Sequence, residues 1–226
     1  MEARLLNELL KAQTEKRAVV LATRLSDGMQ KLAYPTDKTH ESWLLEPVSQ
    51  VLANDKSRVI TDPDGAEWFL NAFNPPLRLI VIGAVHIAQP VSIMAKLVGY
   101  DVTIVDPREA FASPERFPDV TVRCEWPDEA MAALAPDART AVVTLTHDPK
   151  LDDPALVAAL NSPCFYIGAL GSKKTHASRL ERLKAQGFTD QALARIHGPI
   201  GLNIGGKSPA EIAISIMAEI TSVLRQ

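Results

Sequence analysis

The sequence predicts an α/β protein: a Rossmann-like, mostly parallel sheet with helices on both faces, preceded by a small α+β domain. From residue 77 onward, short apolar runs alternate with segments of helical period, which is the rhythm of a parallel sheet covered on both faces. Before that point, two strand–turn–strand patterns alternate with two helical patterns, as in an α+β domain. Asn74-Pro75-Pro76 forms a stiff connector between them. The expected domains are therefore residues 1–74 and 77–226.

Composition restricts the class of protein. The chain has 226 residues, of which 46% are hydrophobic and 23% are charged, so a globular protein with a packed core is expected. The formal net charge is −3, and this balance offers no basic face for a nucleic-acid partner. With Cys124 and Cys164 as its two cysteines, the chain has neither a disulfide framework nor a zinc ribbon, so both are expected to be inert thiols in buried strands of a cytoplasmic protein.

Neither the N-terminus nor the most apolar stretch predicts a membrane protein. An early acidic residue, Glu2, precedes a helix-period pattern, which differs from a signal peptide. The most apolar stretch, residues 77–100, is interrupted by polar residues and a proline, which disfavours a membrane span.

In the N-terminal region, apolar residues at helical spacing predict a helix over residues 3–13 and a second helix around residues 43–52. Strands are expected at 17–25 and 29–34, joined by the turn Ser26-Asp27-Gly28. The segments 58–61 and 67–73 flank an Asp-Pro-Asp-Gly turn and predict a hairpin. A domain of this size is marginal alone.

In the C-terminal region, continuous apolar runs predict parallel strands at 77–82, 101–105, 121–125, 140–146 and 164–168. Helices are expected at 87–98, 128–134, 154–160, 175–186 and 209–224. Ligands of such sheets bind beyond the carboxyl ends of the strands, where the strand order reverses. The loops that start at Gly83, Asp106, Thr146 and Gly168 are therefore the candidates for a binding site.

The first loop, from Gly83 to Ala88, follows a strand and opens a helix, and Asp106 ends the next strand. This is the context of a dinucleotide-binding fingerprint, but Val85 replaces its middle glycine. A β-branched side chain there puts bulk where a pyrophosphate would lie, which disfavours ordinary NAD(P) binding. His86 stands at the helix mouth, where a charged imidazole is disfavoured. It could contact a ligand or serve only in capping and packing.

The second loop contains Asp106 and Arg108. In dinucleotide-binding sheets, an acidic residue at this strand end forms hydrogen bonds with a ribose diol. An arginine can bind a phosphate through two nitrogens. The structural alternative is a local turn with an ion pair.

The third loop, Thr146-His147-Asp148, ends the fourth strand of the sheet. A helix is expected to start at Pro154 with Asp153 as its N-cap, which leaves His147 and Asp148 available as a general base or as ligands. A single histidine among scattered aspartates is weak evidence for a metal, so no metal site is predicted. A solvated polar loop is the alternative.

The fourth loop runs from Gly168 through Gly171 and Ser172 to Lys173 and Lys174. Glycines, a hydroxyl and two lysines at the start of a helix suit a phosphate or another anion. The alternative is a glycine turn with solvated lysines.

Residues 201–208 fit the written P-loop pattern, but the segment before them is a poor strand. Ser208 and Glu211, with Pro209 at the first helical position, instead predict a capping box. Lys207 could give this helix start some affinity for an anion. No set of nucleophile, base and orienting residue can be identified in the sequence, so the catalytic residues are unknown and binding is favoured over turnover.

Four segments together resemble the XdhC/CoxI family, the accessory proteins of molybdenum hydroxylases such as xanthine dehydrogenase. They are residues 81–108, TLTHDPKLDDP at 144–154, YIGALGS at 166–172 followed by Thr175 and His176, and PIGLNIG at 199–205 followed by PAEIA at 209–213. The resemblance covers roughly residues 77–226. It departs from the family pattern at Val85, usually glycine, at Asn203, usually aspartate, and in the N-terminal region, which lacks the family's glycine- and serine-rich segment with its cysteine.

The resemblance implies a role in maturation: binding molybdenum cofactor (molybdopterin), protecting it while its sulfido ligand is installed, and delivering it to the apo-enzyme. The implied partners are the molybdenum hydroxylase and a cysteine desulfurase, and a homodimer is expected by analogy. The alternatives from the residues alone are an NAD(P)-dependent oxidoreductase, because of the βαβ unit and Asp106, and another nucleotide-binding enzyme that uses Lys207.

Overall fold

The computed structural model describes residues 2–35 and 41–225 and divides the chain into two compact units, Met1–Pro75 and Pro76–Gln226. Each unit has its own sheet and its own core, and each is described by itself. Among the described helices, none combines the length and the apolarity that crossing a bilayer requires.

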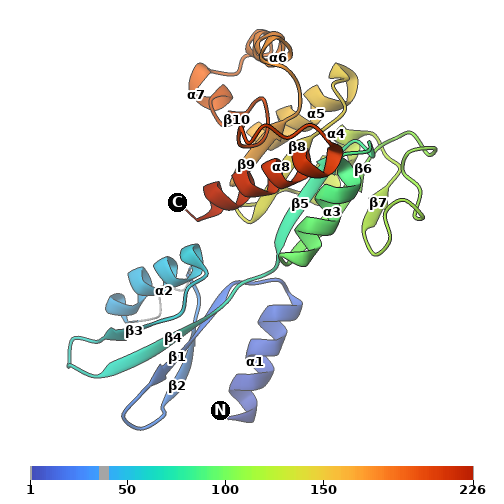
Figure 1. Ribbon diagram of the computed structural model, residues 1–226. Coiled ribbons are helices and arrows are strands. Elements are labelled where there is room, and N and C mark those ends of the chain that lie inside the picture. Colours follow the sequence, from blue (N-terminus) through green and yellow to red (C-terminus); the bar gives the residue numbers. More distant parts are fainter. Residues whose placement is uncertain (1, 36–40, 226) are drawn as a thin grey trace. The chain divides into compact units, whose positions relative to one another are not determined.

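The N-terminal unit is a four-stranded antiparallel sheet with one helix on each face (Figure 1). Its elements are α1 (Ala3–Thr14), β1 (Val19–Arg24), β2 (Gln30–Ala33), α2 (Ser42–Asn54), β3 (Arg58–Thr61) and β4 (Glu67–Phe73), and the strand order is β2-β1-β4-β3. Successive residues of a strand point to opposite faces. Val20 and Ala22 of β1 accordingly pack in the cluster that includes α2, while Val19 and Leu21 pack in the cluster that includes α1.

The C-terminal unit is a six-stranded sheet in which all the strand pairings are parallel. Its strands are β5 (Leu77–Ile82), β6 (Tyr100–Val105), β7 (Thr121–Arg123), β8 (Thr140–Thr144), β9 (Tyr166–Ala169) and β10 (Ile196–His197), in the order β10-β9-β8-β5-β6-β7. This is the Rossmann order, and it reverses direction between β5 and β8. The predicted fold class is confirmed.

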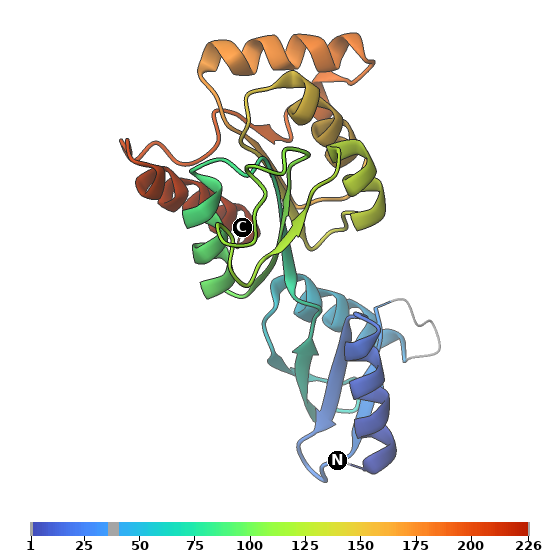
Figure 2. The ribbon, with the colours of Figure 1, turned by 90° about the vertical axis from the view of Figure 1, so that its right-hand side faces the viewer.

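Helices cover both faces of this sheet (Figure 2). One face packs against α3 (Ala88–Leu97) and α8 (Pro209–Leu224), and the other against α4 (Pro127–Leu134) and α5 (Pro149–Leu160). Two further helices, α6 (Lys173–Ala185) and α7 (Asp190–Leu193), add Leu183 and Leu193 to the core on the second face. Because both faces are buried, the central strands are continuous apolar runs, which is the pattern that identified them in the sequence.

The expected start of α5 at Pro154 is wrong. The helix begins at Pro149, and Asp148 is its N-cap, since the Asp148 carboxylate accepts the backbone N–H of Lys150 at 2.9 Å. The sequence offers two Asp-Pro pairs five residues apart, and either pair suits a helix start. The first of them is used, so Pro154 lies inside the helix and Asp153 is free for a tertiary ion pair.

Two further differences concern short or edge segments. The elements α7 and β10 had no counterpart among the expected ones, because four- and two-residue elements leave too little periodicity to detect. The prediction that Cys124 lies in a buried strand is also wrong: β7 ends at Arg123, and the Cys124 side chain is exposed. Cys164 is buried, as expected, but it lies two residues before β9 and not in the strand.

Candidate functional site

The loops after β5 and β8 meet directly at the point where the strand order reverses. Gly83 has a φ of +104°, which disfavours any residue with a side chain. A Cβ atom placed on Gly83 would lie 2.3 Å from the Cγ2 methyl of Thr146. The Thr146 methyl therefore fills the space that the missing side chain leaves, and the two candidate residues are in contact.

Asp106 is fully buried at the end of β6 and holds the neighbouring loop. Its carboxylate accepts the backbone N–H of Ala84 at 2.8 Å, and the backbone N–H, Nε and Nη2 of Arg108 at 3.0, 2.8 and 2.7 Å. Burial alone would raise the pKa of Asp106, but these hydrogen bonds from Arg108 and Ala84 outweigh burial and hold its pKa below the ordinary value. The hydrogen bond to Asp106 raises the pKa of Arg108, and the charge of Asp148 adds to this effect.

This arrangement predicts an acid-sensitive loop. An aspartate whose folded-state pKa is depressed adds stability above its unfolded pKa of about 3.9, and this stability is lost as the pH falls through the lower folded value. We expect Asp106→Asn to be less stable than the wild type at neutral pH and to lose less unfolding free energy below about pH 4, because its amide does not titrate. Urea unfolding as a function of pH measures both, and parallel acid profiles of the two proteins would contradict the assignment.

The third loop is held in place by hydrogen bonds to Asp152 of α5. The Thr146 hydroxyl donates to Asp152 Oδ1 at 2.6 Å, and the His147 N–H donates to Asp152 Oδ2 at 3.1 Å. His147 takes a left-handed conformation with a φ of +65° and is exposed. Its Nδ1 lies 3.7 Å from the position that a Cβ atom on Gly171 would take. The loops after β8 and β9 are therefore adjacent.

Two ion pairs link α5 to α6 beneath these loops. Arg179 is 1% exposed; its Nη2 lies 3.6 Å from Asp152 Oδ2 and donates to the Leu170 carbonyl at 2.8 Å. Burial raises the pKa of Asp152 and lowers that of Arg179. The second pair is nearer the surface, with Arg182 Nε and Nη2 donating to the Asp153 carboxylate at 2.6 and 2.9 Å. Arg179 was not identified from the sequence, because its partner lies in another helix.

The fourth loop contributes Gly171 and Ser172 but not Gly168. Ser172 is the N-cap of α6, and its hydroxyl accepts the Thr175 N–H at 3.1 Å. The first backbone N–H groups of a helix have no acceptor within it and are available to an anion. Gly168 lies inside β9, where a Cβ atom would collide with the Ile200 side chain at 2.5 Å, so packing accounts for this glycine.

The segment after β10 is anchored to α8. Glu219 Oε2 accepts the Gly201 N–H at 2.8 Å and the hydroxyl of Tyr166. Burial is the main cause that raises the pKa of Tyr166 far above its ordinary value, and the hydrogen bond to Glu219 raises it further. One turn of α8 earlier, the Ser215 hydroxyl donates to the Leu202 carbonyl. These contacts fix the loop at 199–206 against the helix.

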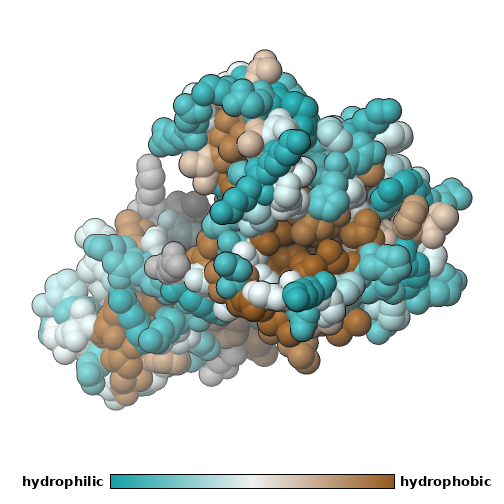
Figure 3. Space-filling model, turned by 45° about the horizontal axis from the view of Figure 1, so that its top comes forward, coloured by the Kyte–Doolittle hydropathy of each residue, from teal (hydrophilic) through white to brown (hydrophobic). Residues whose placement is uncertain are grey.

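A cavity of about 510 Å³ opens between this loop, the start of α6 and α8. Its apolar walls include Leu170, Ile200 and Ile212, and its polar lining includes Lys173 and Asn203. Exposed apolar side chains of Leu202 and Ile204 also line it. Figure 3 shows hydrophobic residues gathered on the α3 and α8 side of this unit.

Two of the residues proposed from the sequence, Lys207 and His86, take no part in these contacts. The backbone N–H of Lys207 donates to Glu211 Oε2 at 2.9 Å, and the predicted capping box of Ser208 and Glu211 is confirmed. Lys207 does not line the cavity. His86 is exposed in the turn before α3. Among the described residues, no group of three or more histidine, cysteine, aspartate or glutamate side chains is arranged to hold a metal ion.

The remaining candidates thus gather at one edge of the sheet, where Gly83 lies against Thr146, Asp106 binds Arg108, and His147 lies beside Gly171. Sequence reasoning missed Asp152, Arg179 and Glu219. For Asp152 and Glu219, the signal that could have found them is a charged residue inside an otherwise apolar helix, since a buried charge requires a partner.

In comparisons with known proteins, residues 79–220 match the family described as the XdhC Rossmann domain. The chain is 33% identical over 160 residues to the molybdenum cofactor insertion chaperone PaoD of Escherichia coli (strain K12), covering 69% of this chain and 44% of PaoD. It is 32% identical over 171 residues to the uncharacterized protein YqeB of the same strain, covering 75% of this chain and 32% of YqeB. A probable xanthine dehydrogenase subunit of Bacillus subtilis (strain 168) is 29% identical over 153 residues, covering 67% of this chain and 44% of that protein.

The chain therefore spans between 32% and 44% of the length of these relatives. The crystal structure of a xanthine dehydrogenase from Bacillus halodurans superimposes with a TM-score of 0.72 at 24% sequence identity, covering 98% of this chain and 64% of that one. At this identity the likeness shows the fold alone.

Proposed function

Because this chain belongs to the XdhC family through its Rossmann domain, we propose that it is an accessory factor in the maturation of a molybdenum hydroxylase of the xanthine dehydrogenase type. It binds molybdenum cofactor and delivers it to the apo-enzyme, which is its principal partner. The observation that carries this proposal is the 33% identity to a molybdenum cofactor insertion chaperone over 160 residues. The chain spans 44% of that relative, so the role of the whole relative enters here as a proposal only.

The residues at the carboxyl edge suit such a cofactor, which combines a pterin ring system with a phosphate. Binding cavities for small molecules are about 300–1,000 Å³, mostly apolar, with a few placed polar groups, and the cavity of about 510 Å³ beside α6 and α8 falls in this range. Lys173 and the first N–H groups of α6 suit the phosphate. The walls at Leu170, Ile200 and Ile212 suit the ring system.

In this role the chain's own residues bind, orient and exclude water. When bound, the cofactor supplies the molybdenum chemistry on which the client hydroxylase depends. Apolar walls shield the bound group from water, and the lysine and helix N–H groups orient its phosphate end. Capture and release need no covalent step, so the proposed role is that of a non-catalytic carrier.

The alternative, an NAD(P)-dependent oxidoreductase, would need Asp106 to bind a ribose. Asp106 has no exposed surface, and Arg108 and Ala84 already donate four hydrogen bonds to it. We therefore expect no change in melting temperature with NAD(H) or NADP(H) at millimolar concentration, whereas a ligand with Kd a hundredfold lower than its concentration adds about 2.7 kcal/mol of stability. A clear upward shift with either dinucleotide would restore the oxidoreductase proposal.

Delivery is tested by mixing cofactor-loaded chain with an apo-hydroxylase of the xanthine dehydrogenase type. The two proteins are then separated by size, and the pterin is measured in each by the fluorescence of its oxidised form. The proposal expects pterin to move to the hydroxylase faster than free cofactor loads it. If the loaded chain retains its pterin, or loads the enzyme no faster than free cofactor, the delivery role fails.

A further inference from the structure

We propose that the phosphate-bearing ligand lies in the cavity beside β9 and β10, lined by Lys173, the loop at 199–206 and α8, and not at the switch point between β5 and β8. This inference rests on the proposed function and specifies where its ligand is held. Ligands of Rossmann-type sheets ordinarily lie at the switch point, so the proposal moves the site by two strands along the sheet edge.

The switch point is occupied by the protein itself. The Thr146 methyl lies against Gly83, where a dinucleotide phosphate would need backbone access. Val85, in place of the fingerprint glycine, packs partly against the core that contains α3 and α8. Two arginines lie in this region: Arg116 donates to the carbonyls of Ala84 and Phe111, and Arg108 already donates two side-chain hydrogen bonds to Asp106. A phosphate arriving here would have to compete with a buried carboxylate for Arg108.

The cavity, by contrast, is open and held in shape by tertiary contacts. Gly201 has a φ of +94°, and a Cβ atom there would lie 2.4 Å from Ser215 Oγ, so the loop passes as close to α8 as a glycine allows. Glu219 fixes the same glycine through its backbone N–H. A preformed loop spares the ligand the entropy of ordering it.

The charge of the lining selects an anion. Of the thirteen described residues that line the cavity, Lys173 is the one with a charged side chain, and none is acidic. The rest of the lining is uncharged and includes the apolar side chains of Leu170, Ile200 and Ile212. An amphipathic ligand with a flat ring system and one phosphate end matches this division. None of the switch-point residues Gly83, Asp106, Arg108 and Thr146 lines the cavity.

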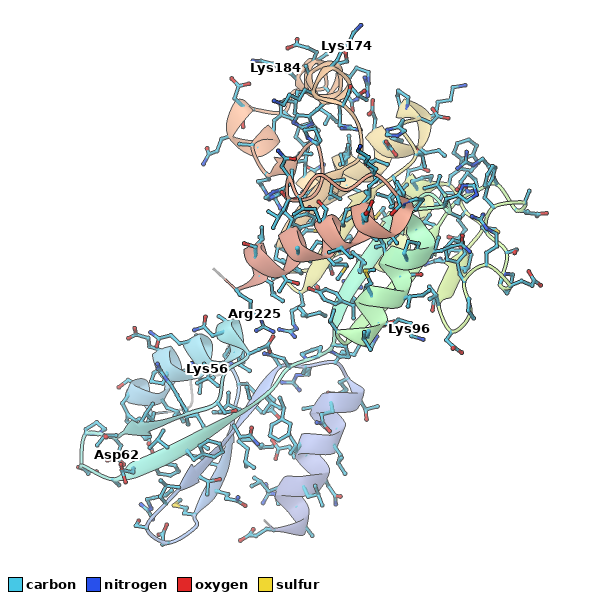
Figure 4. The ribbon with its side chains drawn as sticks, in the orientation of Figure 1. Lys56, Asp62, Lys96, Lys174, Lys184 and Arg225 are labelled. Atoms are coloured by element: carbon cyan, nitrogen blue, oxygen red, sulfur yellow. The ribbon has the colours of Figure 1, made fainter. Side chains whose placement is uncertain are left out.

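The first test compares two neighbouring lysines. Lys173 and Lys174 are both exposed in the first turn of α6, but Lys174 does not line the cavity and projects outward from the helix (Figure 4). The probe is molybdenum cofactor released from a purified molybdoenzyme, and binding is measured by the pterin retained on the protein after rapid desalting. We expect Lys173→Ala to weaken binding about tenfold, as the loss of one charge-assisted contact does, and Lys174→Ala to weaken it less than about twofold.

The second test fills the cavity with a larger side chain. Ile212 lines it and is half-buried, while Ile214, two residues further along α8, is 50% exposed and does not line it. We expect Ile212→Trp to abolish retention of the pterin and Ile214→Trp to leave it unchanged. Circular dichroism and the melting temperature confirm that each variant is folded. Should Ile212→Trp fail to fold, the lysine pair decides the question alone.

The outcomes separate the site from the function. If wild-type protein retains no pterin, the proposed function fails. If wild-type protein retains it while Lys173→Ala and Lys174→Ala bind alike, the cavity is the wrong site and the function stands. If Arg108→Ala weakens binding more than Lys173→Ala does, the ligand lies at the switch point.

Discussion

Replacing Arg179 by methionine is expected to lower the free energy of unfolding of the C-terminal unit by about 3–5 kcal/mol, the cost of removing one partner from a buried ion pair. Arg179 is 1% exposed and Asp152 is similarly buried. Without the guanidinium, the Asp152 carboxylate keeps its bonds from Thr146 and His147 but loses its countercharge. Urea unfolding followed by circular dichroism measures the loss.

The matched control lies one turn away on the same helix. Arg182 pairs with Asp153 as Arg179 pairs with Asp152, but the Arg182 side chain is 37% exposed, so solvent screening reduces its contribution to about 1 kcal/mol or less. Arg182→Met should therefore cost much less than Arg179→Met. The double variant Arg179→Met with Asp152→Asn should regain part of the loss, because its buried amide carries no charge. Equal costs for the two arginines would contradict the buried network.

Replacing Gly83 by alanine is expected to cost about 2–5 kcal/mol, because two penalties act together. The φ of +104° is strained for any residue with a side chain, and the new Cβ would lie 2.3 Å from the Thr146 methyl. Adding Thr146→Ser removes that methyl and keeps the hydroxyl that Asp152 accepts. The double variant should recover the steric part, about 1–3 kcal/mol, and retain the backbone strain.

Gly99 provides the control for strain alone. Its φ of +91° is similar, but a Cβ atom there would meet nothing within 4 Å. Gly99→Ala should therefore cost about 1 kcal/mol, well below Gly83→Ala. If Thr146→Ser gives no recovery in the Gly83→Ala background, the loops after β5 and β8 do not meet as described.

The sequence predicted the fold, and the contacts among the loops at one edge of the sheet, because both depend on local patterns. Continuous apolar runs marked the strands, and the loops after them carried the polar and glycine-rich segments. Parallel strands bring their carboxyl ends to one edge, so contacts such as Thr146 with Gly83 follow from topology once the strand order is known.

The cavity could not be predicted in the same way. Its walls depend on pairs far apart in the chain, such as Tyr166 with Glu219 and Gly201 with Glu219, and one sequence holds no information on which distant residues pair. Gly168 shows the same limit: as part of a glycine-rich run it resembled a ligand loop, while its actual role is to admit Ile200. The choice between Asp148 and Asp153 as helix cap could not be made either, because both precede a proline, and the tertiary partner of Asp153, Arg182, lies in a distant helix.

Both proposals for this chain depend on its binding of molybdenum cofactor. The most direct test is to purify the chain after co-expression with the enzymes of cofactor synthesis and to measure molybdenum by mass spectrometry and pterin by fluorescence in the same sample. We expect molybdenum and pterin to copurify in equal amounts, approaching one per chain, and Lys173→Ala to lower both together. Protein purified at high concentration with neither molybdenum nor pterin, while the cells contain abundant cofactor, would contradict the proposed binding.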